Sequence, residues 1–255
     1  MPSRRSGITI LLVATALLFG SIPFIPRIPQ PQSYHNFADQ RAWLGIPNFG
    51  NVISNVPFAI FGLMGLAFLF SRAAARAFFD PRERWPYLFV FCGLFLTAFG
   101  SGYYHWSPSN ATLLWDRLPM TIAFMGIIAA LISERIGIAA GIYTLTPLLF
   151  IGISSPIQWY FSELHGHGDL RFYAAVQAAA VIALPVFLLL FAPRYTRSFD
   201  LWLVAAFYVL AKLFETFDAQ VFSLGHVVSG HTLKHLAASM SGYWILRMLR
   251  LRRPV

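Results

Sequence analysis

The stretch FVFCGLFLTAFGSGYYHW (residues 89–106), followed shortly by WDRLPM (residues 115–120), shows the pattern that decides the fold. The first run is apolar and ends in a hydroxyl and an imidazole, those of Ser101 and His105. In a helix these two side chains are four residues apart and share one face. Asp116 begins the next apolar run after a short turn. Ionisable groups are expensive in apolar runs, so the stretch predicts two membrane helices with candidate functional residues where they meet.

Each of these residues also has a plain structural interpretation. A single histidine near the end of an apolar helix is more often a hydrogen-bonded interface residue than a metal ligand. Asp116 fits an acidic residue placed against the dipole at a helix N-terminus, with Arg117 as a surface partner. The stretch by itself therefore suggests a site without establishing one.

The composition is that of a membrane protein. Of the 255 residues, 57% are hydrophobic, 16% aromatic and only 11% charged, and the mean hydropathy is +0.62. These values lie outside the range of soluble domains. The net charge of +9 arises from short basic clusters between apolar runs. Clusters in such positions indicate the orientation of helices in a membrane, so we expect no nucleic-acid partner. The single cysteine, Cys92, excludes an intramolecular disulfide and a cysteine-rich metal site.

Apolar runs of about 20 residues, the length that a bilayer requires, predict an all-α polytopic bundle of eight membrane helices. The first run, after Arg4 and Arg5, resembles a signal peptide but lacks a small-residue cleavage site, so we expect a retained helix. Residues 1–48 should form this helix and an outer loop, and residues 49–255 a seven-helix catalytic domain. The eight predicted spans are 8–24, 49–70, 86–106, 112–133, 136–157, 172–191, 201–217 and 226–249.

Arginine placement predicts the orientation of the bundle. With the N-terminus inside, thirteen arginines fall in inner segments and three, Arg27, Arg41 and Arg171, in outer ones. This bias favours both termini in the cytoplasm, and a bacterial inner membrane as the location. The inner arginines are Arg4, Arg5, Arg72, Arg76, Arg82, Arg84, Arg135, Arg194, Arg197, Arg247, Arg250, Arg252 and Arg253.

Polar side chains from five of the predicted helices fall at the outer ends, whereas the inner half of the bundle has almost none. Random interface polarity would not segregate in this way, so the pattern predicts a site at the outer end. The residues concerned are Ser54, Asn55, Ser101, His105, Asp116, Glu215, Asp218, His226, His231 and His235.

The last helix carries a metal-binding spacing. His231 and His235 are four residues apart, one turn on a single helix face, which lets two imidazoles bind one ion. A third histidine at the same depth and the absence of thiols favour catalytic zinc, which takes three protein ligands and keeps one open position.

Taken together, several motifs resemble the alkaline ceramidase family, part of a superfamily of seven-helix membrane hydrolases that includes the adiponectin receptors. The resemblance covers the second to eighth predicted helices and leaves the first as an extra one. The motifs are Ser101-x3-His105, Asp116 eleven residues later followed by x-Leu-Pro-Met, Asn51-x2-Ser54-Asn55, and His231-x3-His235.

The resemblance implies roles for individual residues. His105, His231 and His235 would hold Zn²⁺, Asp116 would transfer protons, and Ser101 would stand beside the metal. Physical chemistry supports these roles, because zinc polarises a carbonyl, a carboxylate can act as general base, and a hydroxyl can donate to a developing oxyanion.

The chain departs from the family pattern at one place. Eukaryotic members carry an acidic calcium-binding cluster before the Asn-x2-Ser-Asn element. Here only Asp39 is present, with Asn48 where a glutamate is expected. Calcium is therefore not among the predicted cofactors, and the sequence leaves open whether it binds.

Five further residues are predicted to contact substrate: Ser54, Asn55, Lys212, Glu215 and His226. For Lys212 and Glu215, three residues apart, a buried ion pair that only stabilises the helix is an equally good interpretation. His226 lies five residues before His231 and is interpreted as a supporting or entrance residue.

Two further features lie near these candidates. Lys234 falls between two predicted ligands on another helix face and is expected to snorkel to the interface or to pair with Glu215 or Asp218. The histidine-containing loop 165–171 is expected to be a solvated outer loop.

These observations predict a membrane-embedded zinc amidohydrolase that cleaves ceramide-like lipids into a sphingoid base and a fatty acid. Its expected partners are a membrane lipid substrate and the bilayer, with no nucleic acid, and the sequence does not indicate whether it has a protein partner. The alternative is a non-enzymatic protein, either a haem-binding electron carrier or a receptor-like or transporter-like bundle.

Overall fold

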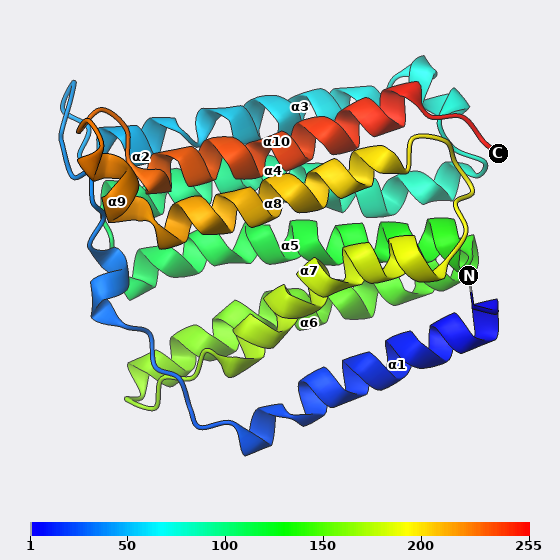
Figure 1. The fold of residues 1–255 in the computed structure, drawn as a ribbon, viewed down its shortest axis with the longest axis horizontal. Coiled ribbons are helices and arrows are strands. Elements are labelled where there is room, and N and C mark those ends of the chain that lie inside the picture. The colour runs from blue at the N-terminus through cyan, green and yellow to red at the C-terminus, as the bar shows by residue number, and fades with distance from the viewer. Residues whose placement is uncertain (1) are drawn as a thin grey trace.

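The computed structural model describes residues 2–255, which are almost wholly helical (Figure 1). No β-strand forms among these residues, although two isolated bridges do. The α-helices are α1 (Arg4–Gly20), α2 (Phe49–Ile53), α3 (Val56–Leu69), α4 (Arg84–Trp106), α5 (Asn110–Arg135), α6 (Ile138–Leu164), α7 (Arg171–Leu190), α8 (Phe199–Thr216), α9 (Asp218–Ser223) and α10 (Gly230–Leu251). The 3₁₀ turns are η1 (Ile22–Phe24), η2 (Gln32–His35), η3 (Arg72–Arg76) and η4 (Pro81–Glu83).

The long helices run along one common direction, and α1 lies at the edge of the bundle, against α7 (Figure 1). Six helical segments in the described chain are long and apolar enough to cross a membrane: Arg4–Phe24, Phe49–Leu69, Pro81–Trp106, Asn110–Arg135, Ile138–Leu164 and Arg171–Leu190. The prediction of an all-helical, multi-pass membrane-type protein is therefore confirmed, but six helical segments meet this criterion and eight were predicted.

The helices α8 and α10 match the last two predicted spans but are too polar to join those six. Helix α8 carries Asp200, Lys212 and Glu215, while α10 carries two histidines and a lysine in its first two turns. The two helices pack closely against each other, so many of these polar groups face protein. Burial against other helices relaxes the demand for an apolar surface.

The second predicted span is interrupted at residues 54 and 55. The Asn55 side chain donates to the Asn51 carbonyl at 2.7 Å, and the Ser54 hydroxyl donates to the same carbonyl at 3.1 Å. Pro57 has no N–H for the Ile53 carbonyl. The chain therefore forms two helices, α2 and α3, in place of the one predicted.

Close approach of α4 and α5 depends on a glycine next to the site. A Cβ atom at Gly100 would lie 2.0 Å from the carbonyl oxygen of Trp115. Only a residue without a side chain fits there. This contact brings Ser101 of α4 alongside Asp116 of α5.

One end of the bundle is covered by the segment between α1 and α2. This segment, drawn in blue, passes across the end where α4 finishes and α10 begins (Figure 1). It buries Gln30, Phe37 and Asp39, each 5% exposed. The outer loop of the prediction is thus packed onto the helices.

Both chain ends lie at the opposite end of the bundle (Figure 1). There Arg252 pairs with Glu134 of α5, and the Tyr87 hydroxyl donates to the same carboxylate at 2.7 Å. The Arg252 guanidinium also lies 4.0 Å from the ring centre of Tyr195. These buried contacts hold the C-terminal residues against the helices.

Candidate metal centre

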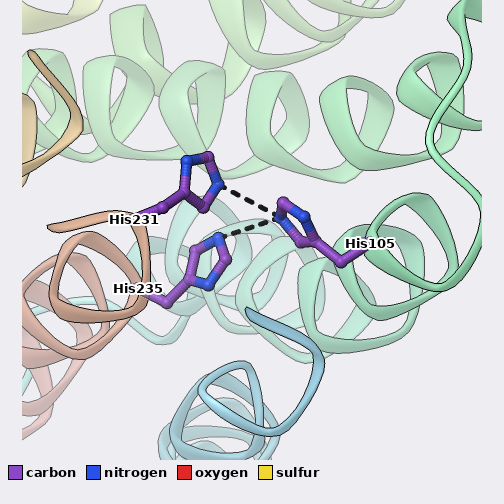
Figure 2. A group of neighbouring side chains, drawn as sticks. All are labelled: His105, His231 and His235. Atoms are coloured by element: carbon purple, nitrogen blue, oxygen red, sulfur yellow. Dashed lines mark hydrogen bonds between the residues drawn. The ribbon is translucent and has the colours of Figure 1, made fainter. Parts of the chain in front are cut away.

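Three histidines converge at the covered end of the bundle. His105 stands in the last turn of α4, and His231 and His235 stand in the first two turns of α10 (Figure 2). Their exposed fractions are 0%, 5% and 3%. The Nε2 atom of His105 lies 3.2 Å from that of His235 and 3.3 Å from that of His231.

This geometry fits a small metal ion. The three imidazoles offer ligand atoms that all lie within 4.8 Å of one another. Nitrogens bound tetrahedrally at about 2.05 Å from zinc would stand about 3.3 Å apart, close to the two separations seen here. Without a proton or a cation between them, facing lone pairs would repel. The predicted ligands are therefore brought together as a buried group that could hold a metal ion.

A hydrogen bond orients His235. Its Nδ1 lies 2.7 Å from the Ser54 hydroxyl, which donates onward to the Asn51 carbonyl. Since that hydroxyl has one proton, His235 must be the donor at Nδ1. The Nε2 lone pair then points towards the other two histidines, as in metal sites where a supporting group fixes the ligand's tautomer.

The start of α10 is fixed by capping bonds. The Ser229 side chain accepts from the backbone N–H of Thr232, and Asp218 accepts from the backbone N–H of His231 at 2.7 Å. The other oxygen of Asp218 accepts from the Ala38 N–H at 2.9 Å. Asp218 thus joins the covering segment to the helix that carries two of the three histidines.

His226 lies outside the site. The prediction that the last helix begins there is wrong, because α10 begins four residues later, at Gly230. His226 is an exposed residue with φ of 53°, and its carbonyl accepts from Arg41. It is not among the residues that line the cavity described below.

Phe37 was not anticipated. Its ring centre lies 4.6 Å from that of His105 and 4.7 Å from that of His231. The residue belongs to the covering segment, so its phenyl ring packs this segment onto two of the three imidazoles. No spacing in the sequence marks this residue, since the contact joins parts of the chain far apart in sequence.

A cavity of about 440 Å³ adjoins the histidines. His235 lines it, together with Ser101 and Asp116. Away from the histidines the wall is mostly apolar and includes Val90, Leu94, Ile127, Leu184, Val204 and Ile245. The cavity is therefore a mostly apolar chamber with a polar end beside the three-histidine group.

Lys212 and Glu215 also line this polar end. Their contact with a substrate stays a prediction. They form an ion pair, and Lys234 approaches the same carboxylate at 3.3 Å. The Tyr34 hydroxyl, from the covering segment, donates to Glu215 at 3.2 Å. Lys212 and Glu215 therefore form an ion pair and also line the cavity, so both interpretations given from the sequence remain.

Ser54 and Asn55 occupy a different place from the predicted one. Neither lines the cavity. Ser54 contacts His235, and Asn55 donates to the Asn51 carbonyl at the break between α2 and α3. Ser54 therefore supports His235, whereas Asn55 stabilises the break between α2 and α3.

Asp39 and Asn48 are engaged within the protein. Two hydrogen bonds of 2.8 and 2.7 Å join Arg41 to Asp39 and hold the pKa of this carboxyl below its ordinary value. The Asn48 side chain donates to the His105 carbonyl at 2.9 Å. These contacts fix the covering segment and the end of α4.

The loop that contains His165 and His167 leaves both histidines exposed. Asp169 in this loop pairs with Arg171 at 2.7 Å. Neither histidine belongs to a metal-binding group in the described part of the chain.

No model of a known protein family matches the chain, and no curated protein matches it. The fold and the site define a class: a multi-pass, helical membrane-type protein with a buried three-histidine group able to hold a metal ion. The resemblance to alkaline ceramidases stays a prediction.

Proposed function

We propose that this protein is an integral membrane, zinc-dependent amidohydrolase that cleaves the N-acyl amide bond of ceramide-like lipids, giving a sphingoid base and a fatty acid. One observation carries the proposal. His235 belongs to the three-histidine group and also lines an apolar cavity whose wall includes Asp116 and Ser101.

The donor set suits zinc. Three neutral imidazoles without thiols, held in a closed pocket with a supporting hydroxyl on one of them, are ligands that zinc takes in catalytic sites. When bound, zinc supplies a Lewis acid that polarises a carbonyl and activates water.

Asp116 and Ser101 supply the proton chemistry in this proposal. Both side chains are buried, at 8% and 2% exposure, and both face the cavity. The Asp116 carboxylate would accept a proton from the attacking water and return it to the leaving amine. The Ser101 hydroxyl would donate to the oxygen that becomes negative during attack.

The apolar part of the cavity suits an acyl chain. From Asp116 to Ile127 along α5 the wall extends for eleven residues, or about 16 Å at 1.5 Å per residue. Each methylene transferred from water to such a wall contributes about 0.8 kcal/mol. A lipid with its amide at the polar end would place its chain along this wall.

The proposed function goes with a proposed topology. Helices α2 to α10 would form a seven-helix ceramidase-like core, with α2 and α3 counted as one span and the short helix α9 left out, and α1 would be the additional helix. Both termini would face the cytoplasm of a bacterial inner membrane, since the arginine-rich segments lie at that end.

The haem alternative is disfavoured by the distances between the histidines. Haem iron takes two axial ligands from opposite faces of the porphyrin. Nε2 atoms that lie 3.2 and 3.3 Å apart leave no room for a macrocycle between them.

Incubating purified protein with N-acyl sphingoid lipids and analysing the products tests the proposal. Asp116→Asn should keep its zinc and lose activity by a factor of about 10²–10⁴, because only the basic oxygen is removed. His105→Ala should lose zinc and activity together. Equal rates for Asp116→Asn and the parent would refute the role of Asp116. A zinc-loaded parent that hydrolyses no N-acyl lipid would refute the proposed reaction.

A further inference from the structure

Arg117 is a buried cation in the wall of the cavity. It follows Asp116 in α5, is 5% exposed and lines the polar end. The plain structural interpretation of the sequence made it a surface partner of Asp116, and its burial contradicts that alternative. Arg117 is also the one arginine that the topology assigned to neither side of the membrane.

Aromatic rings and one amide hold the guanidinium in place. Its central carbon lies 4.1 Å from the ring centre of Trp159, 4.6 Å from that of Tyr173 and 5.8 Å from that of Tyr34. Its Nη2 donates to the side-chain oxygen of Gln30 at 2.7 Å. These contacts orient the cation and attract it, but none of them neutralises its charge.

The other terminal nitrogen has no acceptor. Nη1 of Arg117 is buried and makes no hydrogen bond. None of the ion pairs found in residues 2–255 includes this arginine. Buried donors, and charged ones above all, are normally satisfied, so an incompletely paired guanidinium on a residue that lines a cavity points to a ligand that supplies an acceptor.

The charges in the cavity wall point the same way. The wall contains three cationic side chains and two carboxylates, so its net charge is +1. The cations are Arg117, Lys212 and Lys234, and the carboxylates are Asp116 and Glu215. Glu215 already pairs with both lysines. An unbalanced charge at membrane depth is costly, so an anion is the expected occupant.

Glu163 does not supply the missing partner. Its Oε1 accepts from the Gln30 backbone at 2.7 Å and from the Trp159 indole at 3.1 Å. It therefore stabilises the residues around Arg117 and makes no ion pair with the arginine.

We infer that Arg117 binds the carboxylate of a lipid acid at the polar end of the cavity. The planar guanidinium matches a carboxylate better than a lysine ammonium does. This inference deepens the proposed function and rests on it for the origin of the carboxylate. That group comes either from the fatty acid released by hydrolysis or from an acidic head group, as in an N-acyl amino acid.

Binding of a long-chain fatty acid and of the alcohol of equal chain length tests the inference, measured on detergent-solubilised, zinc-loaded protein above the carboxyl pKa. The acid should bind about 10- to 100-fold more tightly, the range for a charge-assisted hydrogen bond. Arg117→Gln should abolish the difference. Arg194→Gln is the control, because Arg194 lies over the Phe79 ring at the opposite end of the bundle, and this variant should keep the preference for the acid.

Equal affinities of acid and alcohol in the parent would overturn the inference, and so would a preference that survives Arg117→Gln. Arg117→Lys keeps the charge and should show an intermediate preference. If Arg117→Gln loses its zinc or its fold, the comparison of acid with alcohol is made on Arg117→Lys, and an undiminished preference there would overturn the inference.

A second arm identifies the source of the carboxylate. Faster hydrolysis of an N-acyl amino acid than of its methyl ester, dependent on Arg117, would assign the anion to the substrate head group. Equal hydrolysis with Arg117-dependent inhibition by fatty acid would assign it to the product. Arg117-dependent binding without hydrolysis would refute only the proposed function, whereas ceramide hydrolysis without any preference for the acid would refute only this inference.

Discussion

The Ser54 hydroxyl lies 2.7 Å from Nδ1 of His235, and this one contact joins the break between α2 and α3 to the three-histidine group. At the break, the Asn51 carbonyl accepts a hydrogen bond from the Ser54 hydroxyl at 3.1 Å. Because the hydroxyl can then only accept from His235, the interrupted helix determines which nitrogen of that ring is free for a metal.

Ser54→Ala should weaken metal binding while the fold persists. Loss of a group that orients a ligand typically lowers metal affinity about 10- to 100-fold. The measurement is a competition titration of zinc against a chelator. Ser155→Ala is the matched control, because Ser155 is also buried and donates to a carbonyl three residues earlier, but in α6. Equal affinities in the two variants would contradict the role given to Ser54.

Purified protein should contain about one zinc ion per chain and show no haem absorbance, since the three imidazoles leave space for one small ion. His231→Ala should lose the metal, whereas His165→Ala, in an exposed loop, should retain it. Elemental analysis and an absorption spectrum measure both. A haem spectrum, or unchanged metal content in His231→Ala, would end the zinc interpretation.

Gly100→Ala should destabilise the protein by about 1–3 kcal/mol, the usual range for overpacking. Its Cβ would stand 2.0 Å from the Trp115 carbonyl oxygen and push α4 away from α5. Gly102→Ala in the same helix meets nothing within 4 Å, so it should be neutral or stabilising by up to about 1 kcal/mol. Thermal unfolding of both variants in detergent measures the difference. Equal stabilities would show that α4 and α5 can separate freely there.

Cysteine labelling in a Cys92→Ala background should reveal the orientation. With both termini in the cytoplasm, His167→Cys in the loop between α6 and α7 should react with an impermeant reagent in intact cells. Ala75→Cys, exposed at the other end in η3, should react only after permeabilisation. The reverse result would place the three-histidine group on the cytoplasmic side and overturn the predicted topology.

Much of the site was accessible to prediction from spacing. His231 and His235 share a face because they are one helical turn apart, and Ser101 and His105 do so for the same reason. The plain structural interpretation placed Arg117 at the surface, because a charged residue beside a predicted helix start resembles an ordinary end charge. Its burial depends on Trp159 and Tyr173 from two other helices, which no local pattern connects to it.

The sequence by itself determined that the chain is a bundle of apolar helices, because hydrophobic runs of bilayer length leave no other way to satisfy the backbone. It also determined that Ser101, His105, His231 and His235 lie at the same end of the bundle, since their positions within the runs fix their depth. Only the tertiary structure decided that Ser54 supports His235, that Phe37 packs on two of the histidines, and that Arg117 faces the cavity with one nitrogen unpaired. Depth along a helix follows from counting residues, but which side chains meet across helices depends on rotation and close packing, and these are settled by all the helices together.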